Sequence, residues 1–124
     1  MEKMIENVEK SGAASIGITM YPAYPDGSFK NTIMSTPFLY QNGNDWTWFG
    51  GRMIQQLVNY GFVEEAYQQI LPMTDRVVKN NSFYEFYSLN NEPMGSASYR
   101  GSAGVLYKAI LMLEDWAVEV KREI

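Results

Sequence analysis

The residues of this chain that could carry chemistry gather in two short stretches. Residues 40–52, YQNGNDWTWFGGR, combine amides, an Asp, an Arg and two Trp around an Asn-Gly turn. Residues 82–87, SFYEFY, hold one carboxylate among aromatic rings. Such mixtures suit sugars, because amides and carboxylates hydrogen-bond hydroxyl groups while flat rings cover the C–H faces. We therefore take residues 40–48 as the wall of a candidate sugar site.

Glu85 is the carboxylate best suited to a catalytic role. On a strand it would share one face with Phe83 and Tyr87, where an unpaired carboxylate is costly. Two explanations remain open for it. It is either the base of a hydrolytic site, or the partner of Arg52 or Arg100 in an ion pair that ties a loop to a helix.

Two further acids have simpler explanations. Asp26 precedes Gly27 in a Pro-Asp-Gly sequence, which is typical of a turn. Asp45 stands directly before an apolar-periodic run, where a helix takes its N-cap. For Arg100, a hydrogen bond to a sugar hydroxyl and bonds to carbonyls of its own loop are both open.

Composition excludes several kinds of chemistry. The chain has 124 residues, enough for a single domain over 1–124, and 46% of them are hydrophobic, which is ample for a core. It contains neither cysteine nor histidine, so disulfides, thiolate nucleophiles, Ser-His-Asp triads and Cys- or His-ligated metals cannot form. We expect no metal and no cofactor. The net charge of −4 argues against nucleic acid and anionic membranes as partners.

No feature of the sequence indicates a membrane span. The longest apolar runs are too short to cross a bilayer, and the first residues, MEKMIENVEK, are too charged for a signal peptide. We expect a soluble chain. The compartment of the parent protein, cytoplasm or periplasm, stays open.

Periodicity predicts a mainly α chain with long ordered loops. Four helices are expected at 2–10, 46–60, 63–79 and 102–121, and short strands near 16–20 and 83–87. The connection at Gly61 is so short that the second and third helices should form an antiparallel hairpin. Pro72 should kink or break the third helix. Asn44-Asp45 and residues 82–101 lead into two helices, so both stretches should meet at one end of the bundle.

Two features of the helices require close neighbours. Gly50-Gly51 costs about 1 kcal/mol per residue relative to Ala inside a helix, so a backbone or a ligand must need the space. The last helix carries two apolar stripes, which indicates that other helices cover it on two sides. One stripe comprises Ala103, Leu106, Ile110, Leu113, Ala117 and Val120, and the other Val105, Ala109, Met112 and Trp116.

Residues 40–48 resemble the Y-x-N-G-x-x-W-x-W segment of the six-hairpin, (α/α)6-barrel glycosidases, closest to the C-terminal glucosidase domain of glycogen debranching enzyme and its bacterial relatives. The resemblance continues at residues 71–73, 83–85 and 100–104, and covers roughly residues 20–118. Gln41 departs from it, because many relatives carry His there. The implied fold is a partial (α/α)6 toroid, the C-terminal part of a larger barrel domain.

The resemblance implies an inverting glycoside hydrolase in which Glu85 matches the position of the general base. It further implies that Tyr40, Asn42, Trp46, Trp48 and Arg100 bind an oligosaccharide or glycoside substrate. One Trp is expected in the core and the other on the sugar. No residue matches the general acid, so the isolated chain should be inactive.

Partners follow from the incomplete barrel. Either the remaining hairpins of a parent barrel or a second copy of the chain should cover its free helix faces, most simply as a two-fold dimer. The alternative function is a non-enzymatic module that binds saccharide or a protein.

Overall fold

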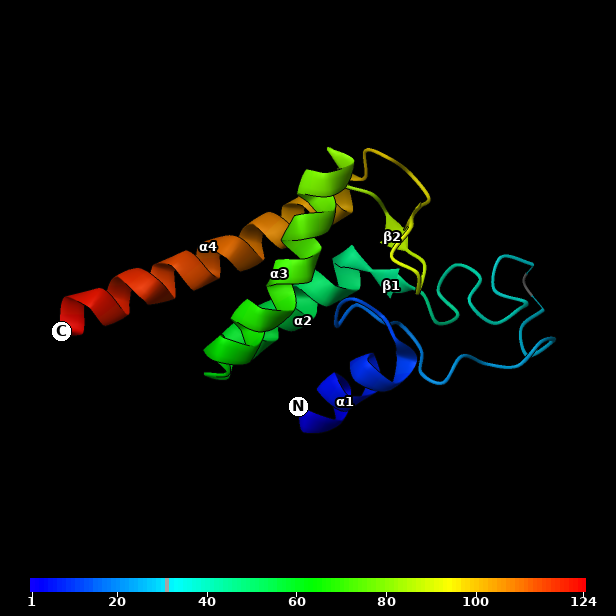
Figure 1. Cartoon of the computed structure of the whole chain (residues 1–124), viewed down its shortest axis with the longest axis horizontal. Helices are drawn as coiled ribbons and strands as arrows, with labels where there is room; N and C mark the ends of the chain where they lie inside the picture. The colour runs from blue at the N-terminus through cyan, green and yellow to red at the C-terminus, as the bar shows by residue number, and fades with distance from the viewer. Residues whose placement is uncertain (31) are drawn as a thin grey trace.

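Helices make up most of the regular structure in the computed structural model, which describes residues 1–30 and 32–124 (Figure 1). Within these residues the helices are α1 Glu2–Ser11, α2 Thr47–Asn59, α3 Val63–Asn80 and α4 Arg100–Glu123. Three short strands accompany them: β1 Asp45–Trp46, β2 Phe86–Tyr87 and β3 Pro93–Met94. The predicted mainly α fold is confirmed, with each helix boundary within two residues of its expected place.

α2 and α3 form the predicted antiparallel hairpin. Gly61 adopts a left-handed conformation, with φ of 82°, and the Phe62 amide then donates to the Leu57 carbonyl at 2.8 Å. α3 continues through Pro72 as one helix, so Pro72 does not break it, while the alternative of a kink stays a prediction. The carbonyl that loses its hydrogen bond to Pro72 belongs to Gln68, an exposed residue.

α2 is the central helix, and it packs against both α3 and α4. Its two glycines permit this. A Cβ at Gly51 would lie 3.1 Å from Cγ1 of Val105 on α4, and one at Gly50 would lie 3.0 Å from the Cα of Gly17. The prediction that these glycines allow close backbone approach is confirmed.

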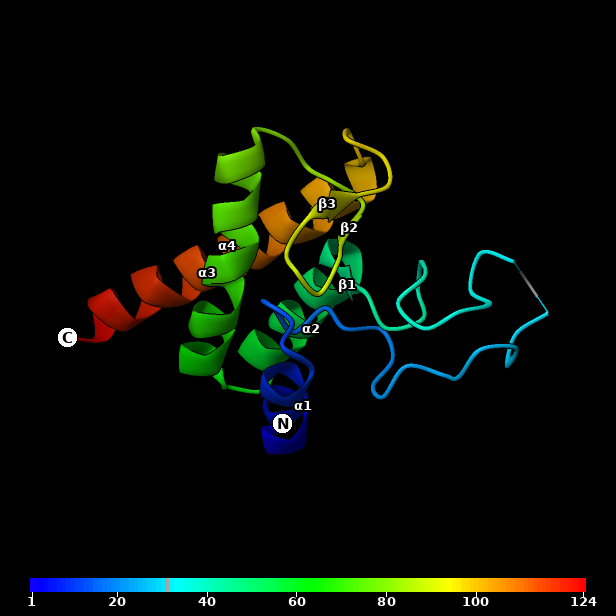
Figure 2. The same ribbon diagram turned by 45° about the vertical axis from the view of Figure 1, so that its right-hand side comes forward.

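The three strands form one small antiparallel sheet in the order β1-β2-β3 (Figure 2). Trp46 pairs with Phe86, and Phe86 pairs with Met94. Of the strands expected near 16–20 and 83–87, only the second forms, over residues 86–87. In the first range, Ile18 contributes a single bridge to Asp45. The sheet joins the segment before α2 to the segment before α4.

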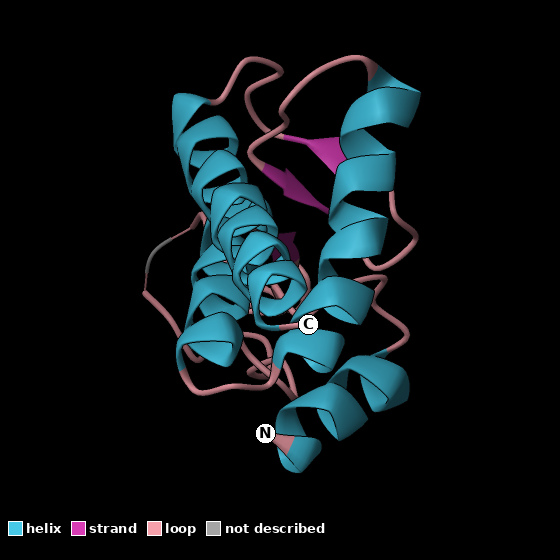
Figure 3. Ribbon diagram, turned by 90° about the vertical axis from the view of Figure 1, so that its left-hand side faces the viewer, coloured by secondary structure: helices cyan, strands magenta, loops and turns pink. Residues whose placement is uncertain are grey.

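The core lies where α1, α2, α3 and the first half of α4 meet. Its buried apolar members are Val8, Ile16, Ile54, Leu57, Ala66, Ile70, Met73, Leu106 and Ala109. The second half of α4 continues past the ends of α2 and α3 (Figure 1), and in the end-on view of Figure 3 it lies beside α3. Of the second stripe on α4, Val105 and Ala109 are buried, whereas Trp116 is 43% exposed.

Candidate active site

The two chemistry-bearing stretches meet at one end of the helices. β1 precedes α2, β2 lies in the segment before α4, and the two strands pair directly. The Tyr40 hydroxyl donates a hydrogen bond to Oε1 of Glu85 at 3.2 Å. The prediction that the two stretches meet at one end of the bundle is therefore confirmed, while the catalytic role of Glu85 stays a prediction.

Glu85 is held by donors rather than by a cation. Its Oε2 accepts a hydrogen bond from the Ser96 amide at 3.0 Å, and the side chain is half-buried. Gly95 makes room for it, since a Cβ there would lie 2.6 Å from Oε2. Among the described residues no ion pair involves Glu85, and the alternative that pairs it with Arg52 or Arg100 is absent.

Aromatic rings form the floor beside this carboxylate. Trp46 stacks on Phe86 with ring centres 4.8 Å apart and planes 10° from parallel. Tyr40 packs edge-on against both rings, at 4.7 and 5.6 Å. The Trp46 indole also donates to the Tyr40 carbonyl at 3.2 Å. These contacts fix the tyrosine that holds Glu85.

One tryptophan lies in the core as predicted, while the contact of the other with a sugar stays a prediction. Trp46 is 3% exposed and belongs to the aromatic floor, whereas Trp48 is 46% exposed near Gly101, at the start of α4. Trp48 is therefore the ring that a ligand can reach. Arg100 is also exposed, and it makes no ion pair with any described residue.

Asn42 organises the loop instead of facing solvent. It is fully buried, its carboxamide oxygen accepts from the Tyr24 amide at 2.8 Å, and its NH2 group donates to the carbonyls of Tyr24 and Thr36 at 3.1 Å each. A direct contact between this amide and a substrate, as the resemblance implied, does not fit the geometry. Its role is to position the loop that carries Tyr40.

The loop held by Asn42 is strained where it meets the floor. Phe38 and Tyr40 both have positive φ, 63° and 51°, which costs free energy for residues with a Cβ. A hollow of about 340 Å³ lies beside them. Its lining includes Phe38, Tyr40, Phe86, Met94 and the buried Asn44, whose Oδ1 has no hydrogen-bond partner among the residues that the structure describes.

Asp45 does not cap α2, which corrects the N-cap prediction. No side chain caps this helix. The Asp45 carboxylate instead forms a fully buried ion pair with Arg76 of α3 and accepts hydrogen bonds from the amide and hydroxyl of Ser15, the latter at 2.7 Å. A buried guanidinium is a stronger partner than helix N–H groups, because an unpaired charge there is very costly.

Sequence reasoning missed Arg76, although its position held a signal. It follows Met73 by three residues on the buried face of α3, so it needs an anion. Its guanidinium lies 4.3 Å from the centre of the Tyr87 ring, and its Nε donates to Asn91 at 2.6 Å. Arg76 thereby fixes β1 and the end of β2 to α3, which positions the floor of the site.

Burial raises the pKa of Tyr40 above its ordinary value near 10, and the neighbouring charge of Glu85 raises this pKa further. The hydroxyl therefore keeps its proton and remains a donor to Glu85. A pKa raised on folding stabilises the fold fully below the unfolded value, and this contribution disappears as pH rises through the folded value.

We expect an ultraviolet difference titration of the wild type minus Tyr40→Phe to show one tyrosine that ionises above pH ~10. Glu85→Gln should lower this pKa, because it removes the anion while burial persists. A Tyr40 titration unchanged by Glu85→Gln would contradict the contact.

The described residues contain no cluster of acidic side chains able to hold a metal ion. None of the helices within those residues is long and apolar enough to span a membrane.

Comparison with protein-family models, with characterised proteins and with solved structures gives no match to this chain. The geometry of the site is therefore the basis on which its function is inferred.

Proposed function

We propose that this chain supplies the general base and part of the sugar pocket of an inverting glycoside hydrolase, with Glu85 as the base. The observation that carries the proposal is the carboxylate itself. It is half-buried, is oriented by the Tyr40 hydroxyl and the Ser96 amide, and has no cation beside it among the described residues.

In this mechanism Glu85 accepts a proton from a water molecule whose oxygen attacks the anomeric carbon. The bond to the leaving oxygen breaks as a general acid protonates it. In inverting enzymes the two carboxyl groups stand about 6.5–9.5 Å apart, which leaves room for this water. Tyr40 and Ser96 each use one lone pair of the Glu85 oxygens, so others remain for the water.

The general acid belongs, in this proposal, to the other hairpins of a parent (α/α)6 barrel. The α2–α3 hairpin, with α2 packed between α3 and α4, is consistent with a segment of such a toroid. General acid catalysis contributes about 10²–10⁴-fold. We therefore expect no enzymatic hydrolysis of maltose or aryl glycosides by the isolated chain. Turnover of either substrate that is abolished by Glu85→Gln would show that this chain contains a general acid of its own, which would contradict the proposal.

Binding tests the site without requiring turnover. Two probes suit it: maltose, and the cationic iminosugar 1-deoxynojirimycin, whose ammonium would pair with a base carboxylate. In NMR titrations at millimolar concentration we expect shifts at Trp48, Tyr40 and Ser96. Glu85→Gln should weaken binding of the iminosugar about ten-fold, the effect of losing one charged hydrogen bond. Binding of maltose should weaken less.

A matched control lies in the same segment. Glu92 is exposed, and its side chain makes no hydrogen bond or ion pair with a described residue. Glu92→Gln should therefore leave the affinities for maltose and for the iminosugar unchanged. Equal losses from Glu85→Gln and Glu92→Gln, or shifts confined to α3 and α4, would overturn the site.

The exposed Trp48 favours a second function, binding of saccharide without catalysis. A module of this kind would bind maltose and iminosugar with similar affinity, and Glu85→Gln would leave both unchanged. The iminosugar titration therefore distinguishes the two functions.

A further inference from the structure

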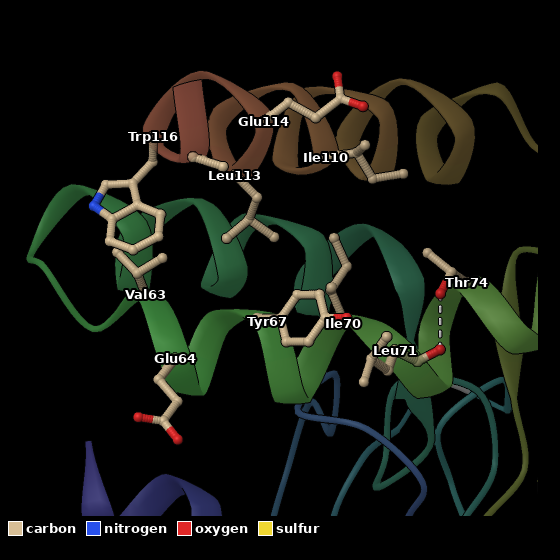
Figure 4. Close-up of a pocket in the computed structure, with 11 residues that line it drawn as sticks. Val63, Glu64, Tyr67, Ile70, Leu71, Thr74, Ile110, Leu113, Glu114 and Trp116 are labelled. Carbon is tan, nitrogen blue, oxygen red and sulfur yellow. Dashed lines mark hydrogen bonds between the residues drawn. The ribbon is translucent and has the colours of Figure 1, made fainter. Parts of the chain in front are cut away.

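An apolar groove runs between α3 and the second half of α4, far from Glu85 in the sequence and on different elements. Its volume is about 600 Å³. Figure 4 shows Tyr67 and Leu71 of α3 on one side, and Leu113 and Trp116 of α4 on the other. Tyr67 is 57% exposed and Leu71 42% exposed. Large apolar side chains gathered in one groove favour a partner surface.

The same half of α4 carries a regular apolar stripe that extends beyond the chain's own core. Ile110, Leu113, Ala117, Val120 and Ile124 follow one another at alternating intervals of three and four residues, the heptad spacing of a helix that pairs with another helix. Ile110 and Leu113 pack partly against the core, whereas Ala117 and Ile124 are exposed. The stripe thus continues from the core into the more exposed end of α4.

Two charges beside this stripe are complementary to each other. Glu114 and Lys121 each directly follow a stripe residue and lie seven residues apart, about two turns, so they flank the stripe on the same side. Both are exposed, and neither makes an ion pair with a described residue. Their separation is too long for a pair within one helix.

We propose that two copies of this chain associate through antiparallel α4 helices. A two-fold axis between positions 117 and 118 brings Glu114 level with the partner's Lys121, and Lys121 level with the partner's Glu114. One contact therefore makes two ion pairs. In a parallel arrangement in register, Glu114 would lie level with the partner's Glu114, and Lys121 with the partner's Lys121. Opposite charges meet only in the antiparallel arrangement, so the charges favour it.

This arrangement also fills the groove. Positions 111–117 of one α4 lie level with positions 118–124 of the other, so the apolar side chains of Val120 and Ile124 in each copy reach the groove of the opposite copy. The groove carries the acids Glu64 and Glu114, and the incoming helix end carries Lys121 and Arg122 together with Glu119 and Glu123, so its side-chain charges balance. Apolar fit, with the Glu114–Lys121 pairs at its edge, therefore favours this occupant.

Charge reversal tests the proposal without disturbing the fold, because both residues are exposed. In sedimentation equilibrium we expect the wild type to dimerise, and Glu114→Lys or Lys121→Glu to raise the dissociation constant about ten- to thirty-fold, since two attractive contacts become repulsive. The double variant should regain wild-type dimerisation. An equimolar mixture of the single variants should form heterodimers.

Two controls complete the experiment. Asp115→Lys makes the same charge change one residue further, on a different face of α4, and should leave dimerisation unchanged. Ala117→Glu places a charge beside the axis on an exposed residue and should abolish it. A monomeric wild type, an equal loss from Asp115→Lys, or a double variant that stays weak would overturn the proposal. Glu85→Gln should dimerise normally, so this inference and the glycosidase proposal stand or fail separately.

Discussion

Arg76→Met is expected to lower the free energy of unfolding by about 3–5 kcal/mol, because it leaves the Asp45 carboxylate buried without its cation. Arg76 and Asp45 are 1% and 0% exposed, so water cannot replace the lost partner. Such a loss is a large part of the 5–15 kcal/mol that typically separates folded and unfolded states. Urea unfolding followed by circular dichroism measures it.

A double-mutant cycle shows whether the ion pair is responsible. Asp45→Asn with Arg76→Met leaves no buried charge, and the amide can still hydrogen-bond Ser15, so the double variant should be more stable than Arg76→Met alone. Arg52→Met is the matched control. Arg52 is exposed, with one long hydrogen bond of 3.4 Å to Gln55, and its loss should cost no more than about 0.5 kcal/mol. Similar losses at positions 52 and 76 would refute the assignment.

Gly17→Ala should lower stability by about 1–3 kcal/mol or more, through overpacking against atoms that cannot move aside. A Cβ at this position would lie 2.4 Å from both Asp45 Oδ1 and the Trp46 carbonyl oxygen. The Trp46 amide also donates to the Gly17 carbonyl at 2.8 Å, which holds the two backbones together. The methyl group must therefore push β1, and with it the aromatic floor, away from the segment around Gly17.

Gly104→Ala is the control for this substitution. Gly104 is exposed on α4, and a Cβ there would meet nothing within 4 Å. Alanine should stabilise the helix by up to about 1 kcal/mol, because glycine is the poorer helix former. Thermal melting of both variants checks the contrast. A Gly17→Ala protein that melts at or above the wild-type temperature would show that the close approach is not needed.

Local sequence determined the helices and their ends. Apolar periodicity placed all four helices, and glycines at positions 12 and 61 end α1 and separate α2 from α3 in left-handed conformations. The short connection also predicted the hairpin. These features depend on residues within a few positions of one another, so a pattern in the sequence is enough to predict them.

The site was predictable in part. The meeting of Tyr40 and Glu85 follows from the two helices that their segments precede, because α2 and α4 begin at the same end of the molecule. The roles of Asn42 and Asp45 could not be predicted from the sequence. Each takes partners far along the chain, backbone groups of residues 24–36 for Asn42 and Ser15 and Arg76 for Asp45.

The tertiary structure alone decided which polar groups are buried together. Asp45 would cap α2 as an isolated helix, but folding brings Arg76 against it, and a buried cation outcompetes the helix N–H groups. Likewise, the sequence predicted that both stripes on α4 are covered along the whole helix, whereas the buried residues of α4 all lie in its first half. Periodicity gives the face of a helix that is apolar, but contacts between distant segments decide where along its length that face is covered.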